Sequence, residues 1–351
     1  MKQATTAGRA ATLLNGLASG ILAALGIFGF ASAAGAEEGG RLTLIEENDS
    51  IVFPTDRYYT QGFAFAYLTG DVDGDSIWDS PFSGLESLGA FGTPEAESSR
   101  RYEFIFGQSI FTPEDTDRSN PDPDDRPYAG WLYGGIGFIQ DTDRRQLDHL
   151  ELLVGIVGPG AQARPAQNDW HQFIGVADAE GWDYQLDNEP GVMLSYGRKW
   201  RFIQPLAGGF AVDAIPELGV TAGNVMTYGE AGGILRFGRN LEADYGAPRI
   251  RPALSGTSYF NGDYLEDPFG FYVWIGAQGR AVARNIFLDG NTFEDSRDVD
   301  KEILVGDISG GVALFWDRSI RLDAGFTYRT QEFEGQDDEA KFANVNLSIG
   351  F

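Results

Sequence analysis

The sequence predicts an all-β protein, a transmembrane antiparallel β-barrel of about twelve strands. Three observations indicate this fold: a secretory start, a series of alternating segments of roughly ten residues, and a final strand that ends in Phe351. Strict alternation of apolar and polar residues is the pattern of a β-strand. A charged face opposite an aromatic-rich face suits a wall with lipid outside and a polar lumen inside.

Residues 1–36 are typical of a secretory signal peptide. A basic start precedes the apolar stretch Ile21–Phe30, and small residues follow it. This order marks a signal peptide, and we expect cleavage after Ala33 or Ala36. A retained anchor is the alternative, but the apolar run is short for a membrane span, and no later run reaches 18 apolar residues. We therefore expect one mature domain, 37–351, and no transmembrane helix.

The last two segments show the alternation most clearly. In Phe342–Phe351 the odd-numbered positions are apolar, and the even-numbered ones from Asn344 on are polar or small. In Ser319–Thr330 the even-numbered positions are mostly apolar or aromatic, and the odd-numbered ones include Arg321 and Asp323. A lipid-facing side and a lumen-facing side explain both patterns. Twelve strands are expected on this basis, at Arg41–Asn48, Gln61–Thr69, Arg101–Phe111, Gly130–Asp141, Arg145–Val157, Gly191–Phe202, Phe210–Thr221, Met226–Phe237, Phe269–Ala283, Glu302–Phe315, Ser319–Thr330 and Phe342–Phe351.

The connections between these strands differ in length. The tight turn Asp317–Arg318 suits the periplasmic side, and long polar stretches suit the extracellular side. One of them, Gly158–Pro190, contains AQNDWHQFIG, where we expect a short helix. The long stretches expected outside are Asp71–Arg100, Thr112–Tyr128, Gly158–Pro190, Gly238–Pro268 and Gln331–Lys341.

The composition limits the partners. The chain of 351 residues carries a formal net charge of −26 and has no cysteine. An acidic chain argues against nucleic-acid binding, which needs a basic face. Without cysteine there is no disulfide scaffold, although a secreted protein could have one. The charge is compatible with divalent cations or with loops in a cation-rich lipopolysaccharide layer.

A polar cluster at the end of the first strand is the main candidate site. Asn48 and Asp49 offer two oxygen donors there, and hard oxygens suit Ca²⁺ better than zinc. Successive strand residues point to opposite faces, so both side chains reach one ion only if the strand bends or ends there. An ordinary Asn-Asp turn is the alternative interpretation. Thr60 lies near the same rim, where a β-branched residue that starts a strand is equally expected.

The chain has two histidines, and they differ in context. His149 lies inside the strand LDHLELLVG, where a lumen or wall residue is the expected role. His171 lies in a long outer loop, in QNDWHQFIG, and is the candidate general base. A serine nucleophile elbow, a cysteine nucleophile and an H-E-x-x-H zinc motif are all absent from the sequence. What remains is Ca²⁺ polarising an ester carbonyl while histidine activates water.

Several landmarks, in order, resemble the outer-membrane lipid A 3′-O-deacylases, the LpxR-like proteins. They cover most of the mature chain and comprise ENDS at Glu47–Ser50, TDRYYTQG at Thr55–Gly62, DRPYAGWLY at Asp125–Tyr133, VGIVGPGA at Val154–Ala161, WHQFIG at Trp170–Gly175, GWDYQLDNEP at Gly181–Pro190 and the terminal Phe351. The resemblance implies a twelve-stranded barrel in the Gram-negative outer membrane with its active site at the outer leaflet. It implies Ca²⁺-dependent removal of the 3′-linked acyloxyacyl group from lipid A.

The resemblance also implies roles for single residues. The calcium pair falls on Asn48 and Asp49, and the catalytic histidine falls on His171. The family's hydroxyl residue falls on Thr60, which we expect to be the second catalytic residue. Two positions depart from the family. The loop after the third strand lacks the family's lysine, and Arg118 is the nearest substitute for binding substrate. Six positions after the histidine the family has an acid; here Ala177 stands there, followed by Asp178.

Two other functions remain open on the sequence. The first is a non-enzymatic pore or structural barrel, because a fold alone does not decide function. The second is an outer-membrane phospholipase, whose family uses a serine two residues after its histidine; here that position is Phe173. The expected partners are lipopolysaccharide, the outer membrane, and the barrel-assembly machinery through Phe351. We expect a monomer.

Overall fold

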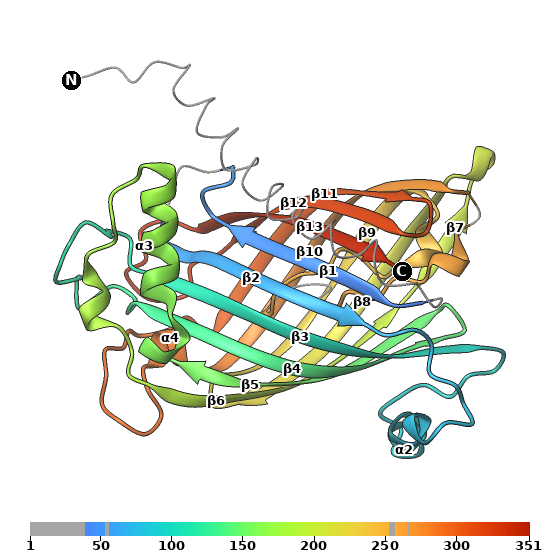
Figure 1. The fold of residues 1–351 in the computed structure, drawn as a ribbon, viewed down its shortest axis with the longest axis horizontal. Helices are drawn as coiled ribbons and strands as arrows, with labels where there is room; N and C mark the ends of the chain where they lie inside the picture. Colours follow the sequence, from blue (N-terminus) through green and yellow to red (C-terminus); the bar gives the residue numbers. More distant parts are fainter. Residues whose placement is uncertain (1–38, 53–55, 253–256, 266) are drawn as a thin grey trace.

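The computed structural model describes residues 39–52, 56–252, 257–265 and 267–351, so the expected signal peptide lies outside the described residues. Thirteen strands form one antiparallel sheet that winds into a barrel (Figure 1). No helix in the described part of the chain is both long and apolar enough to cross a membrane. The strands are β1 Arg41–Asn48, β2 Tyr58–Leu68, β3 Ser98–Thr112, β4 Ala129–Thr142, β5 Gln146–Val157, β6 Glu189–Trp200, β7 Phe202–Pro205, β8 Ala211–Gly223, β9 Met226–Arg239, β10 Phe269–Asn285, β11 Leu304–Trp316, β12 Ile320–Arg329 and β13 Ala340–Gly350.

Twelve of these strands close the barrel. β1 pairs with β13, and β6 pairs with β8, so the ring has no free edge in the membrane. Closure matters because every backbone N–H and C=O at that depth must find a partner within the protein. β7 is the extra strand: it continues β6 beyond Arg201 and pairs with the start of β8. The predicted fold of about twelve antiparallel strands is confirmed, with β7 added.

The two faces of the wall follow the predicted alternation. In β12, Arg321 and Asp323 are fully buried in the lumen, whereas Leu322 and Phe326 are exposed on the lipid-facing side. In β13, Asn346 is buried in the same way. At the C-terminus Phe351 joins the ladder through backbone hydrogen bonds of 3.1 and 2.9 Å with Gly40.

The strand pairing corrects two loop assignments. The turn at Asp317–Arg318 and both ends of the described chain lie at one end of the barrel, which short turns identify as the periplasmic end. Segments 69–97 and 240–268 connect strands at this same end, although the sequence suggested the extracellular side for both. Segments 113–128, 158–188 and 330–339 connect strands at the outer end, as predicted. Polarity alone misled the assignment, because a polar segment at the periplasmic end can also fold into the lumen, as 240–268 does, or cover the outside of the wall, as 69–97 does.

Segment 240–268 folds back into the lumen, and we call its described residues the luminal plug. Two tyrosine hydroxyls of the plug donate to the carboxylate of Asp141, Tyr245 at 2.7 Å and Tyr259 at 3.0 Å. The backbone N–H of Ser258 donates to Glu103 at 2.9 Å. Buried carboxylates need such partners, because an unpaired charge away from water is costly.

Plug arginines neutralise further carboxylates of the wall. Arg251 bonds Glu151 at 2.8 Å, and Arg249 pairs with Glu47 of β1. Another plug residue, Asp244, receives Arg321 of β12 at 2.8 Å and also contacts a second wall arginine. The plug and the wall therefore form one network of buried charges.

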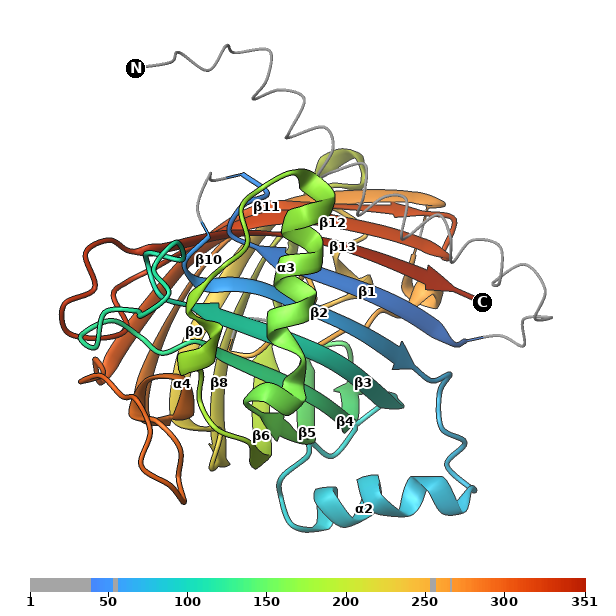
Figure 2. The same cartoon turned by 60° about the vertical axis from the view of Figure 1, so that its left-hand side comes forward.

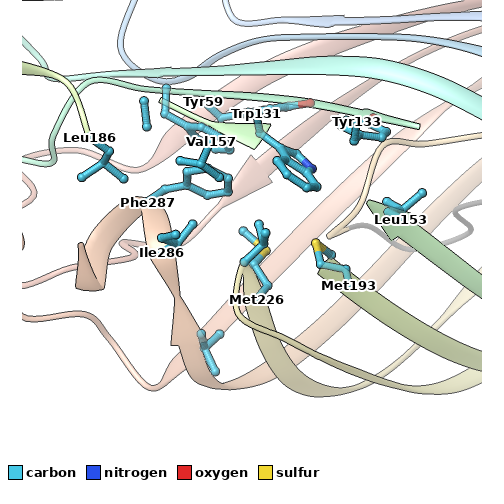
Figure 3. Close-up of a cluster of buried hydrophobic side chains, with 14 of the residues drawn as sticks. Tyr59, Trp131, Tyr133, Leu153, Val157, Leu186, Met193, Met226, Ile286 and Phe287 are labelled. Atoms are coloured by element: carbon cyan, nitrogen blue, oxygen red, sulfur yellow. The ribbon is translucent and has the colours of Figure 1, made fainter. Parts of the chain in front are cut away.

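Apolar side chains fill the lumen beyond this network. At the outer end α4 (Ile286–Asp289) turns inward from β10, and Phe287 stacks on Phe111 with ring centroids 4.1 Å apart. Figure 3 shows Phe287 and Ile286 packed among wall residues such as Trp131 and Met226. At the periplasmic end a second cluster joins the wall to the plug through residues that include Ile139, Leu147, Tyr245, Tyr259, Phe260 and Tyr272.

The charge network predicts a large stability effect inside the barrel and a small one outside. Asp244→Ala removes a fully buried carboxylate from two arginines, and we expect the free energy of unfolding to fall by about 3–5 kcal/mol. Asp263→Ala is the control, because its 3.2 Å pair with Arg318 is exposed, and it should cost less than about 1 kcal/mol. Urea unfolding of the refolded barrel, followed by tryptophan fluorescence, measures both; equal losses would contradict the account.

Candidate active site

The first strand ends where the candidate pair begins. β1 ends at Asn48, and the chain turns at Asp49, so the bend required for the two side chains to approach one ion is present. The Asn48 Oδ1 atom accepts hydrogen bonds from the backbone N–H and the hydroxyl of Ser50, at 2.7 and 2.5 Å. The Asp49 Oδ2 atom accepts the backbone N–H of Arg57 at 2.8 Å. Both side chains are buried at the rim.

A bulge at the start of β2 places Thr60 beside this turn. The pairing of β2 with β3 shifts register between Tyr59 and Gln61, so Thr60 is the extra residue of a β-bulge. Bulges re-aim side chains and are frequent next to active sites. The Thr60 carbonyl accepts the backbone N–H of Asp49 at 3.2 Å, and its hydroxyl bonds the hydroxyl of Thr112 at 2.7 Å.

His171 is delivered by α3 (Ala163–Ile174), which lies across the outer ends of the β3 and β4 strands (Figures 1 and 2). Gly175, which caps the helix after Ile174, has the left-handed conformation. The backbone N–H of Val176 donates to the His171 backbone carbonyl at 2.8 Å. This C-terminal motif reverses the chain. As a result the Ala177 carbonyl lies 2.6 Å from His171 Nδ1. The short helix predicted in this loop is confirmed.

Asp56 is the carboxylate that faces the imidazole. Its Oδ2 atom lies 3.2 Å from His171 Nε2. Its two oxygens also accept the amide N–H groups of Gln167, at 2.9 and 3.2 Å. The indole N–H of the fully buried Trp182 donates to the side-chain amide oxygen of Gln167, Oε1, at 2.8 Å. This chain of hydrogen bonds fixes the carboxylate against the histidine.

The backbone of Asp56 connects the histidine to the first strand. Its carbonyl accepts the hydroxyl of Thr112 at 3.3 Å, and Thr112 is the partner of Thr60. Asp49 is joined to Thr60 through the backbone. The structure thus links the predicted residues Asp49, Thr60 and His171 through two residues that sequence reasoning did not assign, Thr112 and Asp56.

Gln167 was also missed, although a signal for it exists. Positions four apart on a helix lie on the same face, so a residue that supports His171 is expected at position 167. Asp56 stands in the TDRYYTQG segment, but nothing local shows that its carboxylate reaches a helix more than a hundred residues away. At Ala177, where the family has an acid, the backbone carbonyl lies 2.6 Å from His171 Nδ1.

Arg118 stands apart from these residues. Its guanidinium is about half exposed and pairs with Asp122 at 3.1 Å within the same loop. Within the described residues it makes no salt bridge or hydrogen bond to Asp56, Thr60 or His171. Arg126, at the end of the same loop, lies 3.5 Å from Glu332 and packs over the ring of Phe111.

The donors at the β1 turn fit a hard cation. An amide oxygen and a carboxylate, with neither imidazole nor thiolate beside them at the end of the strand, are the ligand types of Ca²⁺ rather than zinc. Asn48 and Asp49 would hold such an ion. The fit rests on donor chemistry and on the turn after β1.

A second group of metal-ligand type lies in the lumen. Glu103, His149 and Glu151 offer ligand atoms that all lie within 4.8 Å of one another, so the group could hold a metal ion. Arg251 of the plug already contacts it, at 2.8 Å to Glu151 and 3.1 Å to His149 Nδ1. Since arginine only donates, Nδ1 accepts, and a neutral ring then carries its proton on Nε2, facing Glu103 Oε2 at 3.6 Å. The predicted lumen or wall position of His149 is confirmed.

A family model for the outer membrane protein LpxR matches residues 18–351. The chain belongs to the LpxR family. It is therefore an outer membrane protein, in agreement with its barrel fold. A search of the curated proteins finds no match.

A solved structure from this family has the same fold. LpxR from Salmonella typhimurium is 19% identical, with a TM-score of 0.69 over 89% of this chain and 100% of that chain, which shows the shared fold. Two further barrels match more distantly. The β-domain of the Bordetella autotransporter BrkA is 13% identical with a TM-score of 0.41, over 89% of this chain and 99% of its own. An outer membrane channel from Pseudomonas putida F1 is 9% identical with a TM-score of 0.39, over 90% and 97%.

The geometry predicts the titration of His171. The hydrogen bond to Asp56 raises the His171 pKa above its usual value of about 6.5, against the opposing effect of burial. Stability from this contact is therefore full below the ordinary pKa and is lost as the pH rises through the raised one. Asp56→Asn should move the titration to lower pH, as followed by NMR of the imidazole. The His149 signal, from the lumen, is the internal reference; an unchanged His171 titration would contradict the assignment.

Proposed function

We propose that this protein is a Ca²⁺-dependent esterase of the outer membrane that removes the 3′-linked acyloxyacyl group from lipid A. LpxR-family membership and the resemblance of its landmarks to the lipid A 3′-O-deacylases support the reaction. The observation that carries the proposal is the placement of His171 against Asp56 at the outer end of the barrel, joined by hydrogen bonds to the Asn48–Asp49 turn. Lipid A resides in the outer leaflet, and the site lies at the barrel end that faces it.

His171 is the proposed general base. When Nδ1 donates its proton to the Ala177 carbonyl, the lone pair of the neutral ring is on Nε2, the atom 3.2 Å from Asp56 Oδ2, so the proposal requires the attacking water to displace that carboxylate oxygen from Nε2. Nε2 takes a proton from this water as the water oxygen adds to the ester carbonyl. The bond between the acyl carbon and the sugar oxygen then breaks, and the imidazolium gives the proton to that departing oxygen, which leaves as a hydroxyl. Asp56 stabilises the imidazolium between these steps. When bound at Asn48 and Asp49, Ca²⁺ supplies a Lewis acid for the ester carbonyl.

Thr60 and Arg118 take supporting roles in this proposal. We assign Thr60 a positioning role, because its backbone carbonyl accepts the N–H of Asp49. Its hydroxyl bonds the hydroxyl of Thr112, which in turn donates to the carbonyl of Asp56. Arg118 is proposed to bind a phosphate of the substrate, since its guanidinium is half exposed on an outer loop.

The filled lumen argues against an open pore. Plug residues neutralise the wall carboxylates, and an apolar cluster around Phe287 closes the outer half. Phe173, the position where the phospholipase family has serine, is exposed on α3, and His171 instead contacts Asp56 and Ala177. Both observations favour a water-activating histidine enzyme.

Mass spectrometry of lipid A from cells that express the protein tests the reaction. We expect a loss equal to one 3′-acyloxyacyl group with the native chain, abolished by His171→Ala or by EDTA and restored by added Ca²⁺. Activity should rise with pH as His171 loses its proton, and Asp56→Asn should shift that rise to lower pH.

Controls in the same assay separate the roles. Arg118→Ala should raise KM and leave kcat unchanged, whereas Arg164→Ala, another half-exposed arginine that pairs with an exposed acid, should change neither. Heat-modifiable migration confirms the barrel fold of each variant. Unchanged lipid A with hydrolysed phospholipid would reassign the substrate, and full activity of folded His171→Ala would remove the proposed base.

A further inference from the structure

Segment 69–97 between β2 and β3 lies against the outside of the barrel wall at its periplasmic end. It contains η1 (Ile77–Asp79) and α2 (Ser80–Ser87), which sit beside the ends of the strands (Figures 1 and 2). The fully buried Phe82 packs on Tyr102 of β3 and Phe138 of β4, with ring centroids 5.3 and 5.8 Å away. Tyr102 occupies a lipid-facing position of β3, in step with Phe104, so the segment covers the lipid side of the wall.

The segment neutralises charges that would otherwise face lipid. Arg100, also on the outer side of β3, bonds Asp79 of η1 at 2.6 Å and pairs with Glu86 of α2. On the neighbouring strands Asp148 pairs with Arg198 at 2.6 Å, and the same arginine donates to the Ala90 carbonyl at 2.9 Å. The acids of η1 and α2 are therefore turned toward the wall and paired there.

Three large apolar side chains of the segment are left exposed. Ile77, Trp78 and Leu88 are 81%, 67% and 82% exposed. The hydroxyl of Tyr102 donates to the Trp78 backbone carbonyl at 2.7 Å, and the Trp78 ring meets the Tyr102 ring edge-on with centroids 6.2 Å apart, so this residue is held at the wall. Large exposed apolar side chains gathered in one segment indicate an interaction surface.

This apolar surface continues the lipid-facing belt of the barrel. The next lipid-facing residue of β3 after the covered Tyr102 is the exposed Phe104, about 7 Å farther along the strand. On β5 and β6 the covered Leu150 and Tyr196 are followed in the same way by exposed leucines, Leu152 and Leu194. The membrane boundary on this side of the barrel thus passes at the level of the segment.

We propose that segment 69–97 is a membrane-interface anchor whose Ile77, Trp78 and Leu88 insert into the phospholipids of the periplasmic leaflet. Tryptophan prefers the boundary between head groups and acyl chains, and apolar helical faces lie in that plane. Pairing with Arg100 neutralises Asp79 and Glu86, the acids of η1 and α2, whose charge would oppose insertion into an anionic leaflet. The inference is independent of the proposed esterase activity.

Site-directed spin labelling tests this anchor, because the chain has no native cysteine. A nitroxide is attached to single-cysteine variants Ile77→Cys and Leu88→Cys of the full barrel, reconstituted in phosphatidylethanolamine–phosphatidylglycerol vesicles. Phe106→Cys, on the lipid-facing wall, is the lipid control, and Asp75→Cys, exposed just before η1, is the aqueous control. The ratio of oxygen to nickel-chelate accessibility is then compared, after heat-modifiable migration has confirmed each fold.

We expect the ratio at positions 77 and 88 to shift from the value of the Asp75 label toward that of the Phe106 label. Ratios equal to the Asp75 value would overturn the proposal, because the segment would then stand in water. Low accessibility to both reagents, or spin–spin broadening at these positions, would also overturn it, because a protein surface rather than lipid would cover the segment.

Discussion

Pairing of buried charge in a closed lumen is the constraint on which the rest of the structure depends. The alternation that places apolar residues toward lipid also turns carboxylates such as Glu47, Glu103 and Glu151 inward, where little water can solvate them. The luminal plug neutralises these carboxylates with Arg249 and Arg251 and with hydroxyl and backbone hydrogen-bond donors. The periplasmic connection is therefore long and polar because it is part of the core.

The same pairing supports the outer rim. Glu47, held by plug residue Arg249, also accepts the hydroxyl of Tyr59 at 3.0 Å. These two wall residues directly precede Asn48 and Thr60, so the plug fixes the strands on which the proposed calcium turn and the bulge are built. Asn48 ends one of these strands and Thr60 lies in the other, whereas His171 is held by the α3 helix and its C-terminal turn.

The fold could be predicted from the sequence because lipid and lumen impose a two-residue period on each strand, as in Ser319–Thr330. The donor types at Asn48, Asp49 and His171 were also recognisable, as was the short helix. The path of segment 240–268 was not, because Arg249 and Arg251 find their partners across the barrel and leave no local pattern. Asp56 was missed for the same reason, and the side of 69–97 was mistaken because polarity does not distinguish an outer loop from a segment that covers the wall.

Calorimetric titration of the purified barrel with Ca²⁺ tests most directly whether the active centre is the outer rim or the lumen. We expect Asp49→Ala to abolish Ca²⁺ binding and Glu151→Gln, in the group of carboxylates around His149, to leave it intact. Retained binding in folded Asp49→Ala together with loss in Glu151→Gln would place the ion in the lumen and contradict the account.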